Sequence, residues 1–316
     1  MALLTTKRIA VLMGGQSAER EISLRSGQAA WAALIRKGYD AVPLDVDAAV
    51  GSRLREIQAH IAFIALHGPG GEDGTIQGML EILRVPYTGS GVRACAVAMD
   101  KAMTKALLDH SGIPVPQGVV LTLRDRKAPR PRGFGWPVVV KPVSQGSTLG
   151  ITIVGKARDL RAGLEAAFKY GPTVLIEEFI EGREITVGVL NGRPLPVIEI
   201  VPKGGFYDFA SKYTPGASIY KVPAPLTSRQ TKLVQSLALD VHHRLGCQGA
   251  TRVDFRLNHQ GRPFVLEINT VPGLTETSLL PMAAKAARFS YEALVEAMLV
   301  SAVERDTSVS PQRRRG

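Results

Sequence analysis

The sequence predicts an α/β protein at its N-terminus followed by an α+β protein, with the two patterns in separate parts of the chain. Three observations support this prediction. In the first hundred residues, short apolar runs alternate with helical segments, which is the order of an open parallel sheet wrapped by helices. A proline-containing joint follows at residues 111–116, and beyond it the strand candidates pair through tight turns. The length of 316 residues suits two domains and does not exclude three.

The N-terminal part begins with an apolar run at residues 7–13 that ends at Gly14-Gly15, as a buried strand running into a tight turn does. An amphipathic helix is expected from about Ser23 to Lys37. Two further strands and the helix between them are expected at residues 41–44, 61–66 and 50–59. Ligands bind beyond the carboxyl ends of strands in such sheets, so the glycine-rich loops at residues 14–15 and 67–74 are candidate site loops.

A helix is expected over residues 92–110, just before the joint. Beyond the joint, Asn191-Gly192 is a strong hairpin signal that leads into a strand at residues 195–201. Strands are also expected at residues 137–140, 151–154, 174–179 and 184–190. The second half should therefore consist mainly of antiparallel strands with a few helices, and we find no internal repeat.

The composition is that of a globular protein with a basic excess. Lys and Arg number 39 against 28 Asp and Glu, a net charge of +11, which raises the question of an anionic partner. The densest basic clusters, at residues 124–132 and 313–315, contain no interleaved aromatic residues, so a solvated surface is favoured over a nucleic-acid site. No apolar run has the roughly 18 residues of a membrane helix. Cys95 and Cys247 have no CxxC context, which favours a reduced, cytosolic compartment.

Two loops are candidates for phosphate binding. Residues 89–94 (GSGVRA) fit the dinucleotide pattern, but they follow a later strand than the first, and the acidic residue about 20 positions on, Asp109, falls inside a predicted helix. A better candidate is the loop after Lys141, where a strand gives way to a glycine- and serine-rich turn up to Gly150. Backbone amides around Gly146 could cradle phosphates there, although the segment also fits a hairpin tip.

The strongest chemical signal is a predicted hairpin between residues 251–257 and 264–269. If Leu257 opposes Phe264, Asp254 opposes Glu267, and two like charges face each other about 5 Å apart. A cation would relieve this repulsion, and the donor set is two carboxylates and the amide of Asn269, which suits Mg²⁺. A charged solvent face in another register is the alternative.

Other residues near this hairpin suit an anionic substrate. Arg252 lies on the same strand face as Asp254 and could bind a phosphoryl group or an oxyanion, together with amides around Gly273. Ser278 and amides near a helix expected from about Pro281 could hold a carboxylate. From the residues alone, the sequence predicts an Mg-nucleotide enzyme acting on a small carboxylated substrate.

Three motifs in order resemble those of the D-alanine–D-alanine ligases of the ATP-grasp superfamily. They are residues 67–78 (HGPGGEDGTIQG), residues 14–21 (GGQSAERE), and Arg252-Val253-Asp254 with residues 267–273 (EINTVPG). The resemblance runs from about Ile9 to Val300. It implies the ATP-grasp fold, with an N-terminal open parallel-sheet domain (residues 1–99), a small central α+β domain (100–182), a C-terminal antiparallel-sheet α+β domain (183–306) and a basic tail (307–316). It also implies that ATP phosphorylates one D-alanine carboxylate and that the amine of a second D-alanine displaces the phosphate.

The resemblance assigns roles at the substrate sites. Glu19, with His67 nearby, should hold the ammonium of the first D-alanine, and Ser278 and Leu279 should receive the carboxylate of the second. Arg252 and the Gly273 amide should form the oxyanion site. Ser147 and Tyr213 should complete a hydrogen-bonded group with Glu19.

The resemblance also assigns the nucleotide and metal sites. Two Mg²⁺ ions, which Mn²⁺ could replace, should bind Asp254, Glu267 and Asn269. The ATP phosphates should contact Lys101, Lys141 and Lys212. The adenosine pocket should comprise Glu177, Glu178, Phe179 and Ile180, with Glu184 on the ribose and Phe206 against the base.

Two positions depart from the family pattern, namely Glu178, where many relatives carry lysine, and residues 143–145. Other activities stay open: a D-alanyl–D-serine or D-alanyl–D-lactate type of ligase, another ATP-grasp carboxylate–amine ligase, or a non-catalytic nucleotide-binding regulator. Lys212-Tyr213 speaks against the lactate type, whose members tend to carry histidine near that tyrosine. The implied partners are D-alanine and ATP, with no nucleic acid or membrane, and the family suggests a cytoplasmic homodimer.

Overall fold

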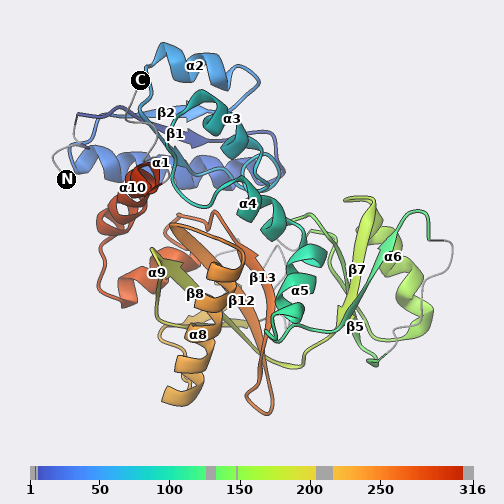
Figure 1. Ribbon diagram of the computed structural model, residues 1–316. Helices are drawn as coiled ribbons and strands as arrows, with labels where there is room; N and C mark the ends of the chain where they lie inside the picture. The colour runs from blue at the N-terminus through green and yellow to red at the C-terminus, as the bar shows by residue number, and fades with distance from the viewer. Residues whose placement is uncertain (1–3, 5, 126–132, 147–148, 204–215, 309–316) are drawn as a thin grey trace.

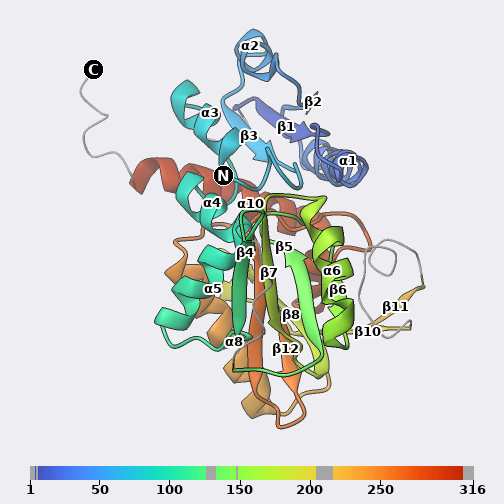
Figure 2. The same ribbon diagram turned by 90° about the vertical axis from the view of Figure 1, so that its right-hand side faces the viewer.

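The computed structural model describes residues 4, 6–125, 133–146, 149–203 and 216–308, with side chains up to residue 303. These residues form three separate sheets that follow one another along the chain (Figure 1). The first sheet, with its helices, lies at one end of the molecule, and the other two lie side by side below it (Figures 1 and 2). The predicted change from parallel to antiparallel pairing is confirmed.

The N-terminal sheet is parallel, in the order β2-β1-β3. Its strands are β1 (Ile9–Met13), β2 (Ala41–Asp45) and β3 (Ile61–Ile64), and its helices are α1 (Arg20–Arg36), α2 (Val50–Glu56) and α3 (Thr75–Leu83). Every residue of β1 is buried, as expected of a central strand with helices on both faces. The loops after β1 and β3 therefore leave the same edge of the sheet.

The predicted helix over residues 92–110 is in fact two helices, α4 (Val92–Met99) and α5 (Lys101–His110). Asp100 lies between them with extended backbone angles and accepts a hydrogen bond from Met103 N at 2.9 Å. This is an N-cap, which starts a new helix in a new direction. The break places Lys101 at the beginning of α5.

The second sheet is antiparallel, in the order β4-β7-β5-β6. It comprises β4 (Gly118–Thr122), β5 (Val138–Pro142), β6 (Thr152–Val154) and β7 (Thr173–Glu178). A 3₁₀ turn (Ala157–Asp159) leads into α6 (Leu160–Phe168), which packs on the sheet around Val138, Val140 and Val174.

The third sheet has the order β11-β10-β8-β12-β13, with β9 paired to β8. Its strands are β8 (Gly182–Leu190), β9 (Arg193–Pro194), β10 (Ile198–Pro202), β11 (Ser218–Lys221), β12 (Ala250–Asn258) and β13 (Pro263–Asn269). Helices α8 (Ser228–Arg244), α9 (Leu279–Ala286) and α10 (Tyr291–Ser308) complete the chain. The hairpin at Asn191-Gly192 is confirmed, with the positive φ angles of 49° and 72° that such a turn requires.

Helix α10 returns to the N-terminal part of the molecule and packs against α1 (Figure 1). Its Leu294, Val295 and Leu299 belong to one hydrophobic core with Leu34 of α1 and Ile198 of β10. The first and third sheets are thus joined by a shared core. Within the described ranges, no helix combines the length and the apolar character needed to cross a membrane.

Candidate active site

A cavity of about 110 Å³ lies where the loops of the N-terminal sheet meet the β12–β13 hairpin and the loop that follows it. Nine of the residues predicted for the site line it: Glu19, His67, Lys101, Arg252, Glu267, Asn269, Gly273, Ser278 and Leu279. These residues are spread over more than 250 positions of the chain, and the fold brings them into one space.

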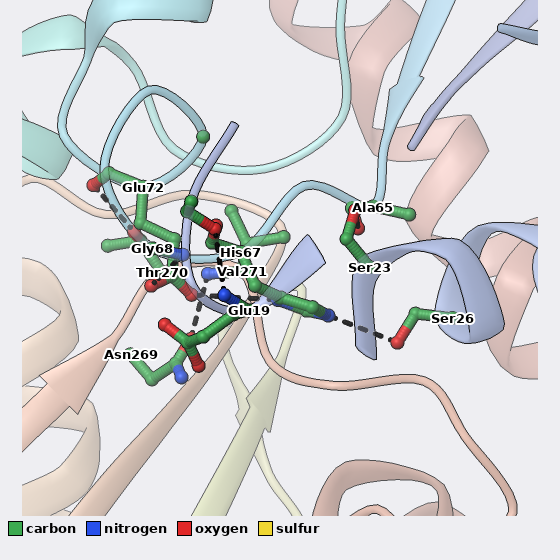
Figure 3. Close-up of polar contacts among 12 residues, drawn as sticks. Glu19, Ser23, Ser26, Ala65, His67, Gly68, Glu72, Asn269, Thr270 and Val271 are labelled. Atoms are coloured by element: carbon green, nitrogen blue, oxygen red, sulfur yellow. Dashed lines mark hydrogen bonds and ion pairs between the residues drawn. The ribbon is translucent and has the colours of Figure 1, made fainter. Parts of the chain in front are cut away.

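Glu19 is buried at the start of α1, with 8% of its surface exposed, and points toward the cavity (Figure 3). Its amide donates to Ser17 Oγ, which in turn donates to the His67 carbonyl at 2.7 Å. Two glycines from other segments approach its carboxylate so closely that a Cβ atom would lie 2.9 Å (Gly68) or 2.7 Å (Gly146) from Oε2. The absence of a side chain at both positions therefore lets the two loops close over Glu19.

His67 forms a buried link between the N-terminal sheet and the loop after β13. Its Nε2 lies 3.0 Å from Ser26 Oγ (Figure 3). The Ser26 hydroxyl also accepts a hydrogen bond from Leu274 N at 3.2 Å. Its Nδ1 lies 3.8 Å from a carboxylate oxygen of Glu72, whose other oxygen accepts from Gly68 N. Ser26 is fully buried on α1 and was not predicted to belong to the site.

The hairpin brings the predicted metal donors together. Asp254 lies opposite Glu267, as predicted, and Arg252 lies opposite Asn269. The assumed pairing of Leu257 with Phe264 is wrong, because Leu257 pairs with Pro263. A β-bulge between Asp254 and Phe255 shifts the register by one residue, so the acidic pair keeps its place although the far end of the hairpin does not.

The acidic donors are paired with cations and a hydroxyl. Arg252 donates to both oxygens of Asp254, at 2.9 and 2.8 Å, and Thr186 Oγ1 donates to Asp254 Oδ1 at 2.6 Å. Lys101 Nζ lies 3.3 Å from Glu267 Oε2. These contacts relieve the repulsion that two facing carboxylates would otherwise feel.

The donor chemistry fits a hard divalent cation. Asp254, Glu267 and Asn269 offer two carboxylates and one amide oxygen on a single face of the hairpin, and two of them line the cavity. The described part of the chain, this hairpin included, has no cluster of three His, Cys, Asp or Glu side chains that could hold a metal ion, so the donor set depends on the Asn269 amide for its third ligand.

The loop after β13 shapes the end of the cavity. Thr275 N donates to Ser278 Oγ at 3.0 Å, and Ser278 N donates back to the Thr275 carbonyl at 2.9 Å. Ser278 is the N-cap of α9, so the first amides of that helix begin beside it. Gly273 packs closely here, since a Cβ atom would lie 2.8 Å from Ser278 Oγ.

A buried cluster of two lysines and one glutamate lies between α5 and the second sheet. Glu177 Oε1 lies 2.5 Å from Lys141 Nζ, and Oε2 lies 2.8 Å from Lys105 Nζ. Burial raises the pKa of Glu177, but the two lysines outweigh this effect and hold it below its ordinary value. Burial lowers the pKa of Lys105 to about 8, although Glu177 opposes that change. Lys101 is not part of this cluster, and its Nζ donates to the Gln145 carbonyl at 2.5 Å instead.

The residues predicted for the adenosine pocket lie where the chain crosses from the second sheet to the third. Glu178 ends β7, Phe179 and Ile180 form the crossover, and Glu184 lies near the start of β8. Arg256 of β12 contacts three of these four residues. Ser147, Phe206, Lys212 and Tyr213 lie outside the described residues.

Several residues near the site were missed at the sequence level, namely Ser26, Glu72, Lys105 and Arg256. Lys105 stands four residues after Lys101 on the same helix face, which is a signal that could have found it. Glu72 lies inside the quoted N-terminal motif. Ser26 and Arg256 gave no local signal, because their partners lie 41 to 248 residues away.

The three-sheet fold, the buried lysines and the carboxylate–amide donor set define an ATP-grasp protein with a small polar cavity. Family models for the D-Ala–D-Ala ligase C-terminus and N-terminus match residues 107–300 and 50–90, respectively. The D-alanine–D-alanine ligase of Syntrophotalea carbinolica is 50% identical over 301 residues, covering 95% of this chain and 97% of the relative. That of Desulforudis audaxviator is 50% identical over 305 residues, covering 95% and 99%. The chain belongs to the D-alanine–D-alanine ligase family.

A solved structure agrees with the sequence relatives. The crystal structure of the Bacillus anthracis D-alanine–D-alanine ligase complexed with ATP superimposes with a TM-score of 0.86 at 32% identity. The match covers 96% of this chain and 100% of that chain.

Proposed function

We propose that the protein is a D-alanine–D-alanine ligase that uses ATP to join two D-alanines through a D-alanyl phosphate intermediate, supplying a peptidoglycan precursor. The observation that carries this proposal is the cavity, which brings a buried carboxylate (Glu19), two cations (Lys101 and Arg252) and the acidic hairpin into one space. An amino-acid ammonium, a phosphoryl group and a divalent cation each find the opposite charge there.

The reaction needs two substitutions, and residues of this chain suit each of them. In the first, a carboxylate oxygen of D-alanine bonds to the γ-phosphorus of ATP, and the bond to the bridging oxygen breaks to release ADP. In the second, the neutral amine of another D-alanine attacks the acyl carbon. The C–O bond to phosphate then breaks, and inorganic phosphate leaves with loss of a proton from the amine. Positioning and neutralisation of charge supply most of the catalysis in such transfers.

The position of these residues around the cavity supports the roles that the resemblance implies. Glu19 holds the ammonium of the first D-alanine beside His67, and Ser278 with Leu279 at the start of α9 receives the second carboxylate. Arg252 and the Gly273 amide stabilise the oxyanion of the tetrahedral intermediate.

The nucleotide occupies the adjoining space. Lys101 and Lys141 contact its phosphates, and the Glu177–Ile180 segment with Glu184 receives its adenosine end. Asp254, Glu267 and Asn269 would hold Mg²⁺, which neutralises phosphate charge when bound. Ser147, Tyr213, Lys212 and Phe206 keep the roles that the resemblance implies.

The remaining assignments complete the proposal. Residues 1–99, 100–182 and 183–306 act as three domains around the site, and the protein works as a homodimer in the cytoplasm, where ATP is available. Its substrates are D-alanine and ATP, rather than a nucleic acid or a membrane.

Phosphate release from Mg-ATP tests the proposal, with D-alanine, L-alanine, D-serine or D-lactate as substrates. D-Alanine alone should support release, and D-alanyl-D-alanine should be detectable by mass spectrometry. Release that needs D-serine or D-lactate would favour the related ligase types, and no release with D-alanine would refute the proposal.

Glu267→Gln tests the metal assignment. Turnover should fall at least a hundredfold, because one charged donor is lost, while the unfolding midpoint stays close to wild type. Glu296→Gln is the matched control, since that carboxylate pairs with Lys37 and Tyr39 away from the cavity and should leave turnover unchanged. A wild-type rate in Glu267→Gln would disprove the assignment.

A further inference from the structure

Arg256 makes three different contacts with the segment that joins the second sheet to the third. Its Nε donates to the Ile180 carbonyl at 3.0 Å, and its Nη1 donates to Glu184 Oε2 at 3.3 Å. Its guanidinium carbon lies 5.4 Å from the centre of the Phe179 ring. The side chain is 15% exposed, so these contacts are largely shielded from water.

Two of these partners, Phe179 and Ile180, lie in the short crossover, and the third, Glu184, lies in β8, where it pairs with Ile200 and Arg256. Strand β7 ends at Glu178 in the second sheet, and β8 begins at Gly182 in the third sheet. The ends of the crossover are fixed by the hydrogen bond from Glu178 N to the Gln117 carbonyl and by the tight packing of Gly182 against Leu257. Arg256 contacts Phe179 and Ile180 between these two anchors and Glu184 just beyond them.

The geometry requires arginine in particular. The planar guanidinium can donate to a carbonyl and a carboxylate along its edge while its face lies against a ring. A lysine ammonium could satisfy one of these contacts at a time. Glu181 lies in the crossover, and Glu178 and Glu184 lie in the strand ends on either side of it. A nucleotide would bring more negative charge, so a fixed cation at this point reduces the repulsion among these groups.

We propose that Arg256 is a positioning residue of the nucleotide site, which holds the Phe179–Ile180 crossover and the Glu184 carboxylate in the arrangement that receives the adenosine end of ATP. This inference rests on the proposed function, which puts adenosine at this crossover. Arg256 itself acts through its three partners and is not needed for the substitutions at phosphorus or carbon.

The test compares Arg256→Met and Arg256→Lys with Arg262→Met. Arg262 lies on the turn of the same hairpin, with its guanidinium carbon 5.1 Å from the Phe264 ring, so its replacement removes a similar arginine–ring contact and leaves the three contacts of Arg256 in place. Steady-state kinetics give KM for ATP, KM for D-alanine and kcat. Direct binding of a fluorescent N-methylanthraniloyl ATP measures nucleotide affinity without turnover.

Arg256→Met should raise KM for ATP and weaken analogue binding about tenfold, since charge-assisted hydrogen bonds are lost. Its KM for D-alanine should stay within twofold of wild type, and Arg262→Met should match wild type throughout. Arg256→Lys should be intermediate with an unchanged melting temperature, and it decides the question if Arg256→Met does not fold. Unchanged ATP affinity in Arg256→Lys and Arg256→Met, or an equal loss in Arg262→Met, would overturn the inference.

The two proposals can fail separately. If the wild-type protein releases no phosphate with D-alanine, the proposed function fails, whereas analogue binding still tests Arg256. If the wild type is active and the Arg256 variants bind the analogue as tightly as it does, the role of Arg256 is refuted and the proposed function stands.

Discussion

Replacing Lys105 by methionine should stabilise the folded protein at neutral pH while weakening ATP binding. Lys105 shares the Glu177 carboxylate with Lys141, so the buried cluster holds two positive charges and one negative charge. Methionine has a similar length and removes one of the positive charges. The remaining Glu177–Lys141 pair is neutral, and no carboxylate is left without a cation.

The size of the effect follows from the pKa. Burial lowers the pKa of Lys105 from 10.5 to about 8, which is about 2.5 pH units at about 1.4 kcal/mol each. Below pH 8 lysine is charged in both the folded and the unfolded protein, and folding bears the whole cost of burying it. Methionine has no such cost, so the free energy of unfolding should rise by up to about 3 kcal/mol at pH 7.

Because the pKa of Lys105 is lowered in the folded protein, the stability difference between Lys105→Met and the wild type should depend on pH. Between pH 8 and pH 10.5 Lys105 loses its proton in the folded protein but keeps it in the unfolded chain. The free-energy cost of burying a charged Lys105 therefore declines as the pH rises. The advantage of Lys105→Met should therefore shrink to about 1 kcal/mol at pH 10. Urea unfolding of both proteins at pH 7 and pH 10 measures this change.

The same variant should bind ATP more weakly. With Lys105 gone, Glu177 pairs with Lys141 alone, and the cluster loses the excess positive charge that would attract phosphates. KM for ATP should rise several-fold, while KM for D-alanine stays near the wild-type value. A loss of stability at pH 7, or an advantage that grows at pH 10, would refute the reasoning.

Two further predictions concern other buried polar groups. Burial lowers the pKa of His242 to about 4, and the ring contacts Thr251 Oγ1 at 2.8 Å. Above pH 6.5 His242 is neutral in both the folded and the unfolded protein. As the pH falls from 6.5 toward 4, the unfolded chain binds the proton first, so the free energy of unfolding decreases. Urea titrations should thus show about 3 kcal/mol less acid destabilisation in His242→Gln than in wild type, and an equal acid response would contradict this. Ser26→Ala should leave two buried groups without a partner, lower stability by about 1–3 kcal/mol and change the pH profile of kcat/KM for D-alanine. Ser23→Ala, which removes one buried hydroxyl bond to the Ala65 carbonyl without changing a residue that lines the cavity, is the control and should leave that profile unchanged.

The sequence predicted which hairpin residues share a face, because strand residues alternate with period 2. The register was assumed from a pairing of Leu257 with Phe264, which is wrong. Asp254 and Glu267 face each other as expected, although the far end of the hairpin is shifted by the bulge. No residue pattern marked that bulge, which lies between Asp254 and Phe255. Turn and strand signals in the second half were equally local, and for that reason the change to antiparallel pairing was predictable.

Contacts between distant segments could not be predicted in this way. The Lys105 ammonium donates to the Val265 carbonyl across 160 residues, and Ser26 meets Leu274 across 248 residues. No periodic pattern in the sequence indicates either contact, because both depend on how the sheets pack together and not on the geometry of one strand or helix. The division of residues 92–110 into two helices was missed for a different reason. A single capping aspartate, Asp100, outweighs the continuous helical propensity around it.

The polar groups of the site are arranged in opposite-charge pairs, and this arrangement has a consequence for binding. Arg252 pairs with Asp254, and Lys101 pairs with Glu267. A divalent cation that binds the acidic residues must displace their cations, and a phosphate chain that binds the cations must displace their carboxylates. Binding of the cation alone would leave the two basic side chains without a carboxylate, and binding of the phosphates alone would leave the two carboxylates without a cation. When both bind, each of these four side chains has a new partner of opposite charge. If the acidic residues bind a divalent cation as proposed, these pairs make binding of that cation and of the nucleotide mutually dependent.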